Sequence, residues 1–162
     1  MQGYPTHWAA WVMAGSGPGG SFVAEILIVD DDGDSVELLM DMLDDTHQVT
    51  GTTDSVKALE LIETRRFDLL ITDVRMPAHN GFTLIRMAKK LKPDLAVIVI
   101  SAYYSKTDPT CCSIVDSFAS VALQKPFTIP GVRAAIEKAL RPAGVDLSRE
   151  PASDRAAGGP AA

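Results

Sequence analysis

Cysteines and long apolar runs are both scarce in this sequence of 162 residues. Its two cysteines, Cys111 and Cys112, are adjacent, so they close no stabilising loop. No apolar run approaches the roughly 20 residues that a membrane-spanning helix needs. The sequence therefore predicts neither a disulfide-stapled scaffold nor a membrane protein. A chain of about 150 residues buries roughly 70% of its unfolded surface, so it needs no such support.

Basic residues are in the minority, with 15 Lys and Arg against 21 Asp and Glu, for a formal net charge of −6. Binding to nucleic acid through its phosphates needs clustered Lys and Arg. We therefore expect no direct nucleic-acid binding. Residues 1–20 contain no Lys or Arg and only a short apolar stretch, which is not the pattern of a secretory signal peptide. We expect a cytoplasmic protein.

Composition divides the chain into three parts. Residues 1–24 are rich in glycine and predict a disordered leader. Residues 142–162 are rich in Ala, Pro and Gly without periodicity, which predicts a disordered tail or a truncated linker. Residues 25–141 carry the regular apolar patterns, and their number suits one domain of ordinary size, because domains cluster at roughly 100–150 residues.

Aliphatic runs alternate with helical periodicities along residues 25–141. The runs predict strands at 26–29, 48–52, 67–72, 96–100 and 121–123. Apolar residues between them recur at spacings of three and four, and Asp54 is a good N-cap for the helix that follows it. About five alternations predict right-handed βαβ units, and hence an α/β fold with a doubly wound, five-stranded parallel sheet and helices on both faces.

Chemically active side chains follow the predicted strands, at the edge where such sheets bind ligands. They are Asp30, Asp31, Asp73, Ser101 and Lys125. Three carboxylates at one edge repel one another, so they need a cation to remain ionised together. An all-oxygen ligand set favours Mg²⁺, and a lysine and a hydroxyl beside it suit a tetrahedral anion. The combination predicts phosphoryl transfer with a carboxylate as the covalent acceptor.

Four motifs in this order resemble the receiver domain of two-component response regulators. They are IVDDD at 28–32, DLLITDVRMP at 68–77 with Gly81 behind it, IVISA at 98–102, and KPF at 125–127. The resemblance covers residues 25–140. It implies a flavodoxin-like sheet with strand order 2-1-3-4-5, and a signalling module that promotes its own phosphorylation and dephosphorylation without being a turnover enzyme.

The resemblance also implies how the phosphoryl group is received. Asp73 would be the phosphoacceptor, and the donor would be a phosphohistidine on a sensor histidine kinase or a histidine phosphotransfer protein. Asp30, Asp31 and Asp73 would hold Mg²⁺, with the backbone carbonyl of Arg75 as a further ligand.

Two further residues would respond to the phosphoryl group. Ser101 and Lys125 would bind it, and the bond between Lys125 and Pro126 would be cis, which costs little before proline. The output would be protein–protein contact with a downstream target, through the face formed by the fourth helix, fifth strand and fifth helix of this fold. The same face would be the surface of a homodimer.

Three other interpretations compete for the acidic run that begins at Asp30. It is a solvated helix start in one of them. In another it is a calcium loop, although Ser35 stands where the loop needs glycine, and a helix should precede it. In the third, Asp30 is the nucleophile of a haloacid-dehalogenase-like phosphatase, which leaves the motif around Asp73 unexplained.

The chain departs from the receiver pattern between Ser101 and Lys125. Ala122 stands where the family usually has an aromatic residue, and Phe118 replaces a usual glycine. We expect that Tyr103 or Tyr104 takes over the readout, or that the fourth helix orders on activation. A pseudo-receiver that binds its partner without phosphorylation is the alternative function, and the intact set of site residues argues against it.

Overall fold

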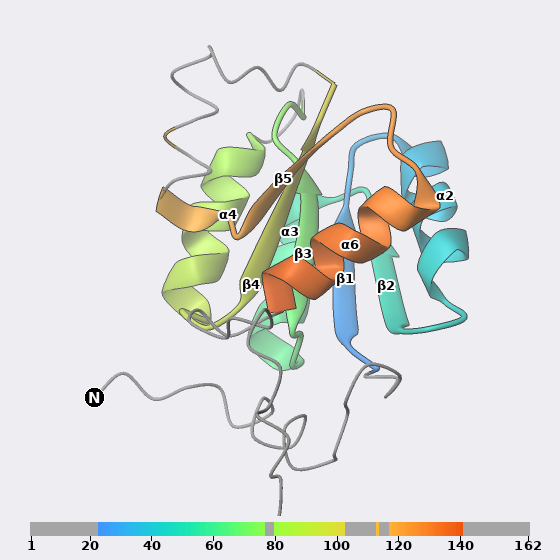
Figure 1. Cartoon of the computed structure of the whole chain (residues 1–162). Coiled ribbons are helices and arrows are strands. Elements are labelled where there is room, and N and C mark those ends of the chain that lie inside the picture. Colours follow the sequence, from blue (N-terminus) through green and yellow to red (C-terminus); the bar gives the residue numbers. More distant parts are fainter. Residues whose placement is uncertain (1–22, 77–79, 103–112, 114–116, 141–162) are drawn as a thin grey trace, which may run out of the picture.

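The computed structural model describes residues 23–76, 80–102, 113 and 117–140 (Figure 1). Along the chain the elements are β1 (Glu25–Val29), α2 (Gly33–Leu43), β2 (Gln48–Thr52), α3 (Ser55–Thr64), β3 (Leu69–Asp73), α4 (Gly81–Leu91), β4 (Ala96–Ser101), β5 (Val121–Gln124) and α6 (Ile129–Leu140). The strands form one parallel sheet in the order β2-β1-β3-β4-β5. The doubly wound sheet predicted from the sequence patterns is confirmed, and so is the strand order that the family resemblance implies.

Two hydrophobic layers sandwich the sheet because alternate residues of the central strands face opposite sides. In β1, Ile26 and Ile28 pack with α2 and α6, whereas Leu27 and Val29 pack with α3 and α4. Figure 1 shows these helix pairs on the two faces. All four of these side chains are buried, which explains why β1 reads as an unbroken aliphatic run.

Three helices begin with a capping side chain. Asp32, Asp54 and Asn80 each accept a hydrogen bond from a backbone N–H in the first turn of α2, α3 and α4, respectively. Such caps satisfy donors that have no partner within the helix, and each is worth about 1 kcal/mol. The N-cap predicted at Asp54 is confirmed. The interpretation of the acidic run as a solvated helix start holds for Asp32, which is exposed and caps α2. It does not hold for Asp30, which is buried.

The register places the strand ends at one edge. Val29 lies opposite Thr72, Asp73 opposite Ile100, and Ser101 opposite Gln124. β3 starts at Leu69, two residues later than predicted, and it ends on Asp73 instead of before it. Before the strand, the ring of Phe67 lies 5.1 Å from the guanidinium carbon of Arg65.

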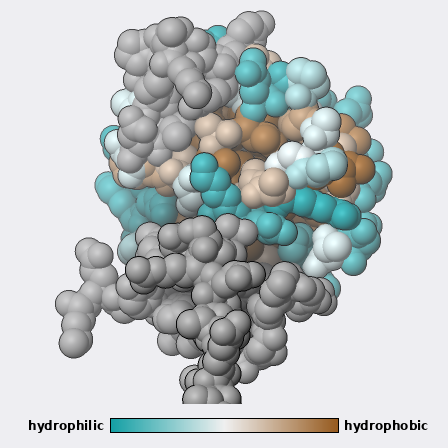
Figure 2. Space-filling model, in the orientation of Figure 1, coloured by the Kyte–Doolittle hydropathy of each residue, from teal (hydrophilic) through white to brown (hydrophobic). Residues whose placement is uncertain are grey.

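The exposed surface is mixed. Figure 2 shows hydrophilic residues interspersed with apolar ones on the face that carries α6. Large apolar side chains that remain exposed are Val23, Leu38, Val56, Met87, Leu91 and Ile129. Within the described part of the chain, no helix has both the length and the apolar character to cross a membrane.

Candidate functional site

Two buried carboxylates lie at the carboxyl edge of neighbouring strands. Asp30 follows β1 directly and is 2% exposed, and Asp73 ends β3 and is 9% exposed. β1 and β3 are adjacent in the sheet, and their last paired residues, Val29 and Thr72, precede the two acids. The strand register therefore brings together two acids that are far apart in the sequence. Charged groups are rarely buried unless they are paired.

Lys125 provides the positive charge between them. Its Nζ lies 2.7 Å from Asp30 Oδ2 and 3.0 Å from Asp73 Oδ2. The lysine follows β5, and its backbone N–H donates to the carbonyl of Ser101 at the end of β4. The peptide bond to Pro126 is cis, as predicted. One ammonium thus contacts the ends of both β1 and β3.

The carboxylates keep this lysine charged. Burial disfavours the ammonium, but the hydrogen bonds and charges of Asp30 and Asp73 outweigh it and raise the pKa of Lys125 above its ordinary value. The ammonium therefore stays protonated at neutral pH. Since charge-assisted hydrogen bonds are short and directional, it is also held in a defined place beside both carboxylates.

The second oxygen of Asp73 has its own donor. The backbone N–H of Arg75 donates to Asp73 Oδ1 over 2.8 Å, while the Arg75 residue itself is exposed. The main chain of Asp73 is packed as well, because the Thr72 hydroxyl donates to the Asp73 carbonyl over 3.0 Å. A Cβ on Gly81 would overlap that same carbonyl oxygen. Both the carboxylate and the main-chain carbonyl of Asp73 are therefore held by neighbouring groups.

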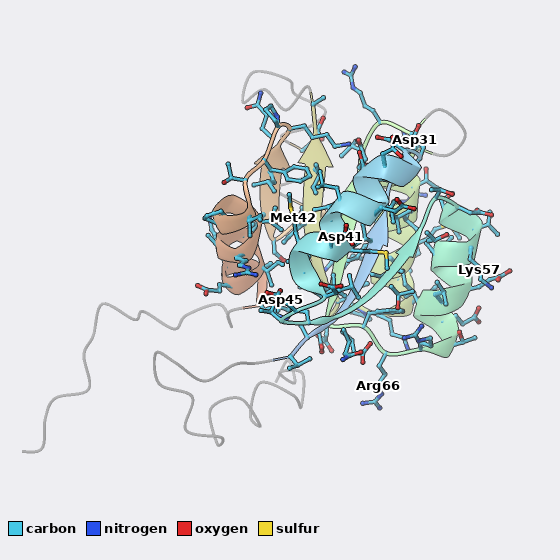
Figure 3. The ribbon with its side chains drawn as sticks, turned by 90° about the vertical axis from the view of Figure 1, so that its right-hand side faces the viewer. Asp31, Asp41, Met42, Asp45, Lys57 and Arg66 are labelled. Carbon is cyan, nitrogen blue, oxygen red and sulfur yellow. The ribbon has the colours of Figure 1, made fainter. Side chains whose placement is uncertain are left out.

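The three consecutive acids have three different environments. Asp30 accepts from Lys125, whereas Asp32 accepts from Asp34 N–H and the Ser35 hydroxyl at the start of α2. The Ser35 hydrogen bond lowers the pKa of Asp32. Asp31 is exposed at the N-terminal end of α2, away from Asp45 at the other end (Figure 3). Its partial burial and then the charge of Asp30 raise the pKa of Asp31, and the charge of Asp73 adds to this.

The donor chemistry of this edge fits a hard cation. The Lys125 ammonium contacts Asp30 and Asp73, so one positive charge faces two carboxylates, with Asp31 next to them in the sequence. Burial is the main cause of the raised pKa of Asp31, and the negative charges of Asp30 and Asp73 add to it. Mg²⁺ prefers such oxygen ligands. Among the described residues, no three His, Cys, Asp or Glu side chains lie in an arrangement that is ready to hold a metal ion. A metal ion would therefore bind together with a rearrangement of side chains.

The remaining predicted site residue is Ser101. It is buried at the end of β4, one residue beyond the partner of Asp73 in the register. Tyr103 and Tyr104, and most of the expected fourth helix, lie outside the described residues. The calcium-loop interpretation is wrong, because the segment before Asp30 is strand β1 and not a helix.

Sequence reasoning missed two features of this site. It did not foresee the direct contact of Lys125 with Asp30, since it assigned the lysine only to the phosphoryl group. The sequence motif included Gly81, but the close approach of this glycine to the Asp73 carbonyl was not predicted. The short spacing between Asp73 and Gly81 was the available signal, because a helix that starts so soon after a strand must pack against the strand end.

Comparison with known proteins identifies the family. Residues 26–137 match the model of the response regulator receiver domain. The DNA-binding transcriptional regulator NtrC of Azospirillum brasilense is 36% identical over 118 residues, which are 72% of this chain and 24% of NtrC. NtrX from Brucella abortus has a TM-score of 0.67 at 30% identity, covering 74% of this chain and 27% of that one.

A third similar protein is the receiver domain of a sensor histidine kinase from Pseudomonas aeruginosa, with a magnesium ion coordinated in its active site cleft. Its TM-score is 0.65 at 22% identity, over 74% of this chain and 98% of that one, so it shows the fold alone. The chain spans only about a quarter of the length of NtrC and NtrX. Since the family model covers well over half of the sequence, and the sheet has the expected strand order, the chain belongs to the response regulator receiver domain family of two-component systems.

Proposed function

We propose that this receiver domain accepts a phosphoryl group from a phosphohistidine onto the carboxylate of Asp73. The supporting observation is the arrangement around that carboxylate: the Lys125 ammonium is on one oxygen and the Arg75 N–H on the other. A carboxylate oxygen of Asp73 attacks phosphorus, the bond from phosphorus to the imidazole nitrogen breaks, and the imidazole takes up a proton. The products are an aspartyl phosphate and a free histidine.

Lys125 and Ser101 stabilise the transferred group in this proposal. The ammonium remains charged because of its two carboxylate partners, so it is ready to move from Asp73 Oδ2 to a phosphoryl oxygen. Ser101 is buried at the neighbouring strand end and would donate its hydroxyl hydrogen to another. Catalysis of phosphoryl transfer consists mainly of positioning and charge neutralisation, and fixed donors supply both.

Mg²⁺ is the cofactor that we propose for this reaction. Asp30, Asp31, Asp73 and the backbone carbonyl of Arg75 would hold it, and when bound it would neutralise negative charge on the carboxylates and the incoming phosphoryl group. The oxygen-only donor set and the excess negative charge support this assignment.

We further propose that the domain acts by signalling in the cytoplasm and not by turnover. Its phosphodonor would be a sensor histidine kinase or a histidine phosphotransfer protein. The output would be contact with a downstream protein through β5, α6 and the segment between β4 and β5, which is also our candidate homodimer surface. Residues 25–141 would form the domain.

Intact-mass measurement tests this function. The full chain is incubated with acetyl phosphate, with and without Mg²⁺, beside Asp73→Asn. We expect the gain of one phosphoryl group that requires both Mg²⁺ and Asp73. No gain under any condition would instead favour a pseudo-receiver that binds its partner unmodified. A gain that survives in Asp73→Asn would contradict the assignment of the phosphoacceptor.

A further inference from the structure

Two phenylalanine rings join separate parts of the sheet's α3–α4 face. The ring centroids of Phe82 and Phe118 lie 6.0 Å apart, with 67° between the ring planes. Both side chains are half-buried against the same hydrophobic layer. Edge-on contacts within about 4.5–7 Å are the favoured geometry of an aromatic pair. Phe82 lies in the first turn of α4, and Phe118 precedes β5, so the contact links two elements that approach the site from different sides.

The α4 side of this contact is packed onto the phosphoacceptor. Gly81, the neighbour of Phe82, donates its N–H to the Val74 carbonyl over 3.2 Å. A Cβ at Gly81 would overlap the carbonyl oxygen of Asp73, so the two backbones are in direct contact. Close-packed groups transmit a displacement because there is no free volume between them to absorb it. A shift of the Asp73 backbone should therefore displace Gly81 and, with it, the adjacent Phe82.

The β5 side of the contact leads to Lys125. Ser120, two residues after Phe118, donates its N–H to the Val97 carbonyl over 2.7 Å and so begins the pairing of β5 with β4. β5 is short, none of its residues is fully buried, and it runs directly into the lysine that binds Asp73. Weakly buried elements have the lowest local stability. Because β5 is weakly buried and ends at Lys125, we expect it to move when the lysine changes partner.

Phe118 also has space beside it. A cavity of about 400 Å³, open to solvent, is lined by Lys89, Pro93, Ser117, Phe118, Ala119 and Ser120. The ring thus has a packed neighbour, Phe82, on one side and an unfilled space on another. A side chain that borders open space has room to change its position, which a two-state readout requires.

We propose that the contact between Phe82 and Phe118 reads the phosphorylation of Asp73. This inference rests on the proposed function. The phosphoryl group changes the packing of Asp73 on Gly81 and draws Lys125 toward itself, so both ends of the aromatic contact are displaced together. The pair would replace the aromatic residue that the family usually has at the position of Ala122, since an alanine side chain has no rotamer to change. The surface that changes on phosphorylation would be formed by residues 117–120, which precede β5 and line the cavity.

Fluorine NMR of the full chain tests the proposal. The protein is labelled with 4-fluorophenylalanine, and the signals of Phe82, Phe118 and Phe67 are assigned from single Leu substitutions. Mg²⁺ with beryllofluoride, a tetrahedral mimic of the phosphoryl group, is then added. We expect the signals of Phe82 and Phe118 to shift by several linewidths. The signal of Phe67, which packs on the same layer but contacts Arg65, should stay in place.

A substitution tests whether the two rings are coupled. In Phe118→Leu we expect the beryllofluoride-induced shift of Phe82 to fall by at least half, whereas in the matched control Phe67→Leu it should remain. The inference is overturned if Phe82 responds fully in Phe118→Leu. It is also overturned if neither ring responds in the unsubstituted protein, which needs no variant to fold.

The backbone amide signal of Arg75 distinguishes failure of the aromatic readout from failure of the proposed function, because the Arg75 N–H donates to Asp73. If the Arg75 amide signal shifts on addition of beryllofluoride while both rings stay silent, the site binds the mimic and only the aromatic readout is wrong. If the Arg75 amide is silent as well, the mimic does not bind, and the proposed function fails together with the inference built on it.

Discussion

Lys125 Nζ lies 2.7 Å from Asp30 Oδ2, although β3 and β4 separate the strands that carry these two residues. The lysine reaches across the carboxyl edge of the sheet and also binds Asp73, which ends the intervening strand β3. In this state the ammonium neutralises part of the charge that Mg²⁺ and the phosphoryl group would otherwise meet. Binding of either proposed ligand would therefore compete with, or rearrange, an ion-pair network that already exists.

Removal of this ammonium should destabilise the domain. In Lys125→Met, two buried carboxylates lose their partner, so we expect the free energy of unfolding at pH 7 without Mg²⁺ to fall by about 1–3 kcal/mol. This is less than the roughly 3–5 kcal/mol of a fully buried pair, because the lysine side chain is 22% exposed. Urea denaturation measures it. Lys57→Met, at an exposed ion pair, is the control and should change little. Equal stability of both variants would contradict the prediction.

Neutralising Asp31 should have the opposite effect. The pKa of Asp31 is raised, first by partial burial and then by Asp30, so its charged form is disfavoured in the folded state. The stability linked to its protonation is present below its ordinary pKa of 3.8 and is lost as pH rises through the folded pKa. Asp31→Asn should therefore be more stable at pH 7 without Mg²⁺, by less than about 1 kcal/mol because the group is exposed and screened.

Thermal unfolding of wild type and Asp31→Asn checks this in two ways. The difference between them should vanish near pH 3, where Asp31 is protonated in both states. Added Mg²⁺ should raise the melting temperature of the wild type more than that of the variant, since one proposed ligand is missing. A variant that gains as much from Mg²⁺ as the wild type would exclude Asp31 from the metal site.

Gly81 should be intolerant of a side chain. In Gly81→Ala the new Cβ overlaps the Asp73 carbonyl, so α4 or the end of β3 must shift. We expect a loss of about 1–3 kcal/mol, typical of overpacking, together with slower Mg²⁺-dependent mass gain from acetyl phosphate. Gly33→Ala is the matched control, because nothing lies within 4 Å of its Cβ position. Its stability should be unchanged or higher, since alanine favours helices.

His47 should make stability depend on pH. Its Nδ1 accepts from the Ala24 N–H over 3.3 Å, so this nitrogen must be unprotonated. Burial lowers the pKa of His47 and the charge of Arg133 lowers it further, against the opposing charge of Asp45. Because the folded pKa is below the ordinary 6.5, this stability is complete above 6.5 and is lost as pH falls through the folded pKa.

The comparison that checks it is between wild type and His47→Gln. Urea midpoints measured at pH 7 and pH 5 should fall more for the wild type than for the variant, because glutamine has no group that titrates in this range. Parallel midpoints for the two proteins would show that His47 contributes nothing to the pH dependence.

The sequence was sufficient to determine the sheet and to predict the candidate site residues. Aliphatic runs such as Ile26–Val29 can only be buried on both faces, and the carboxyl ends of parallel strands must share one edge. Asp30, Asp73, Ser101 and Lys125 were therefore predictable as neighbours. Both predictions depend only on the spacing of apolar residues along the chain and on the parallel direction of the strands, and both can be read from the sequence.

Tertiary structure decided which of these neighbours touch. The contact of Lys125 with Asp30 depends on strand register, and so does the close approach of Gly81 to Asp73. The separate environments of Asp30, Asp31 and Asp32 depend on side-chain directions at the turn into α2. The pairing of Phe82 with Phe118 joins segments far apart in the sequence. Such contacts are set by packing among distant residues, and no local pattern contains that information.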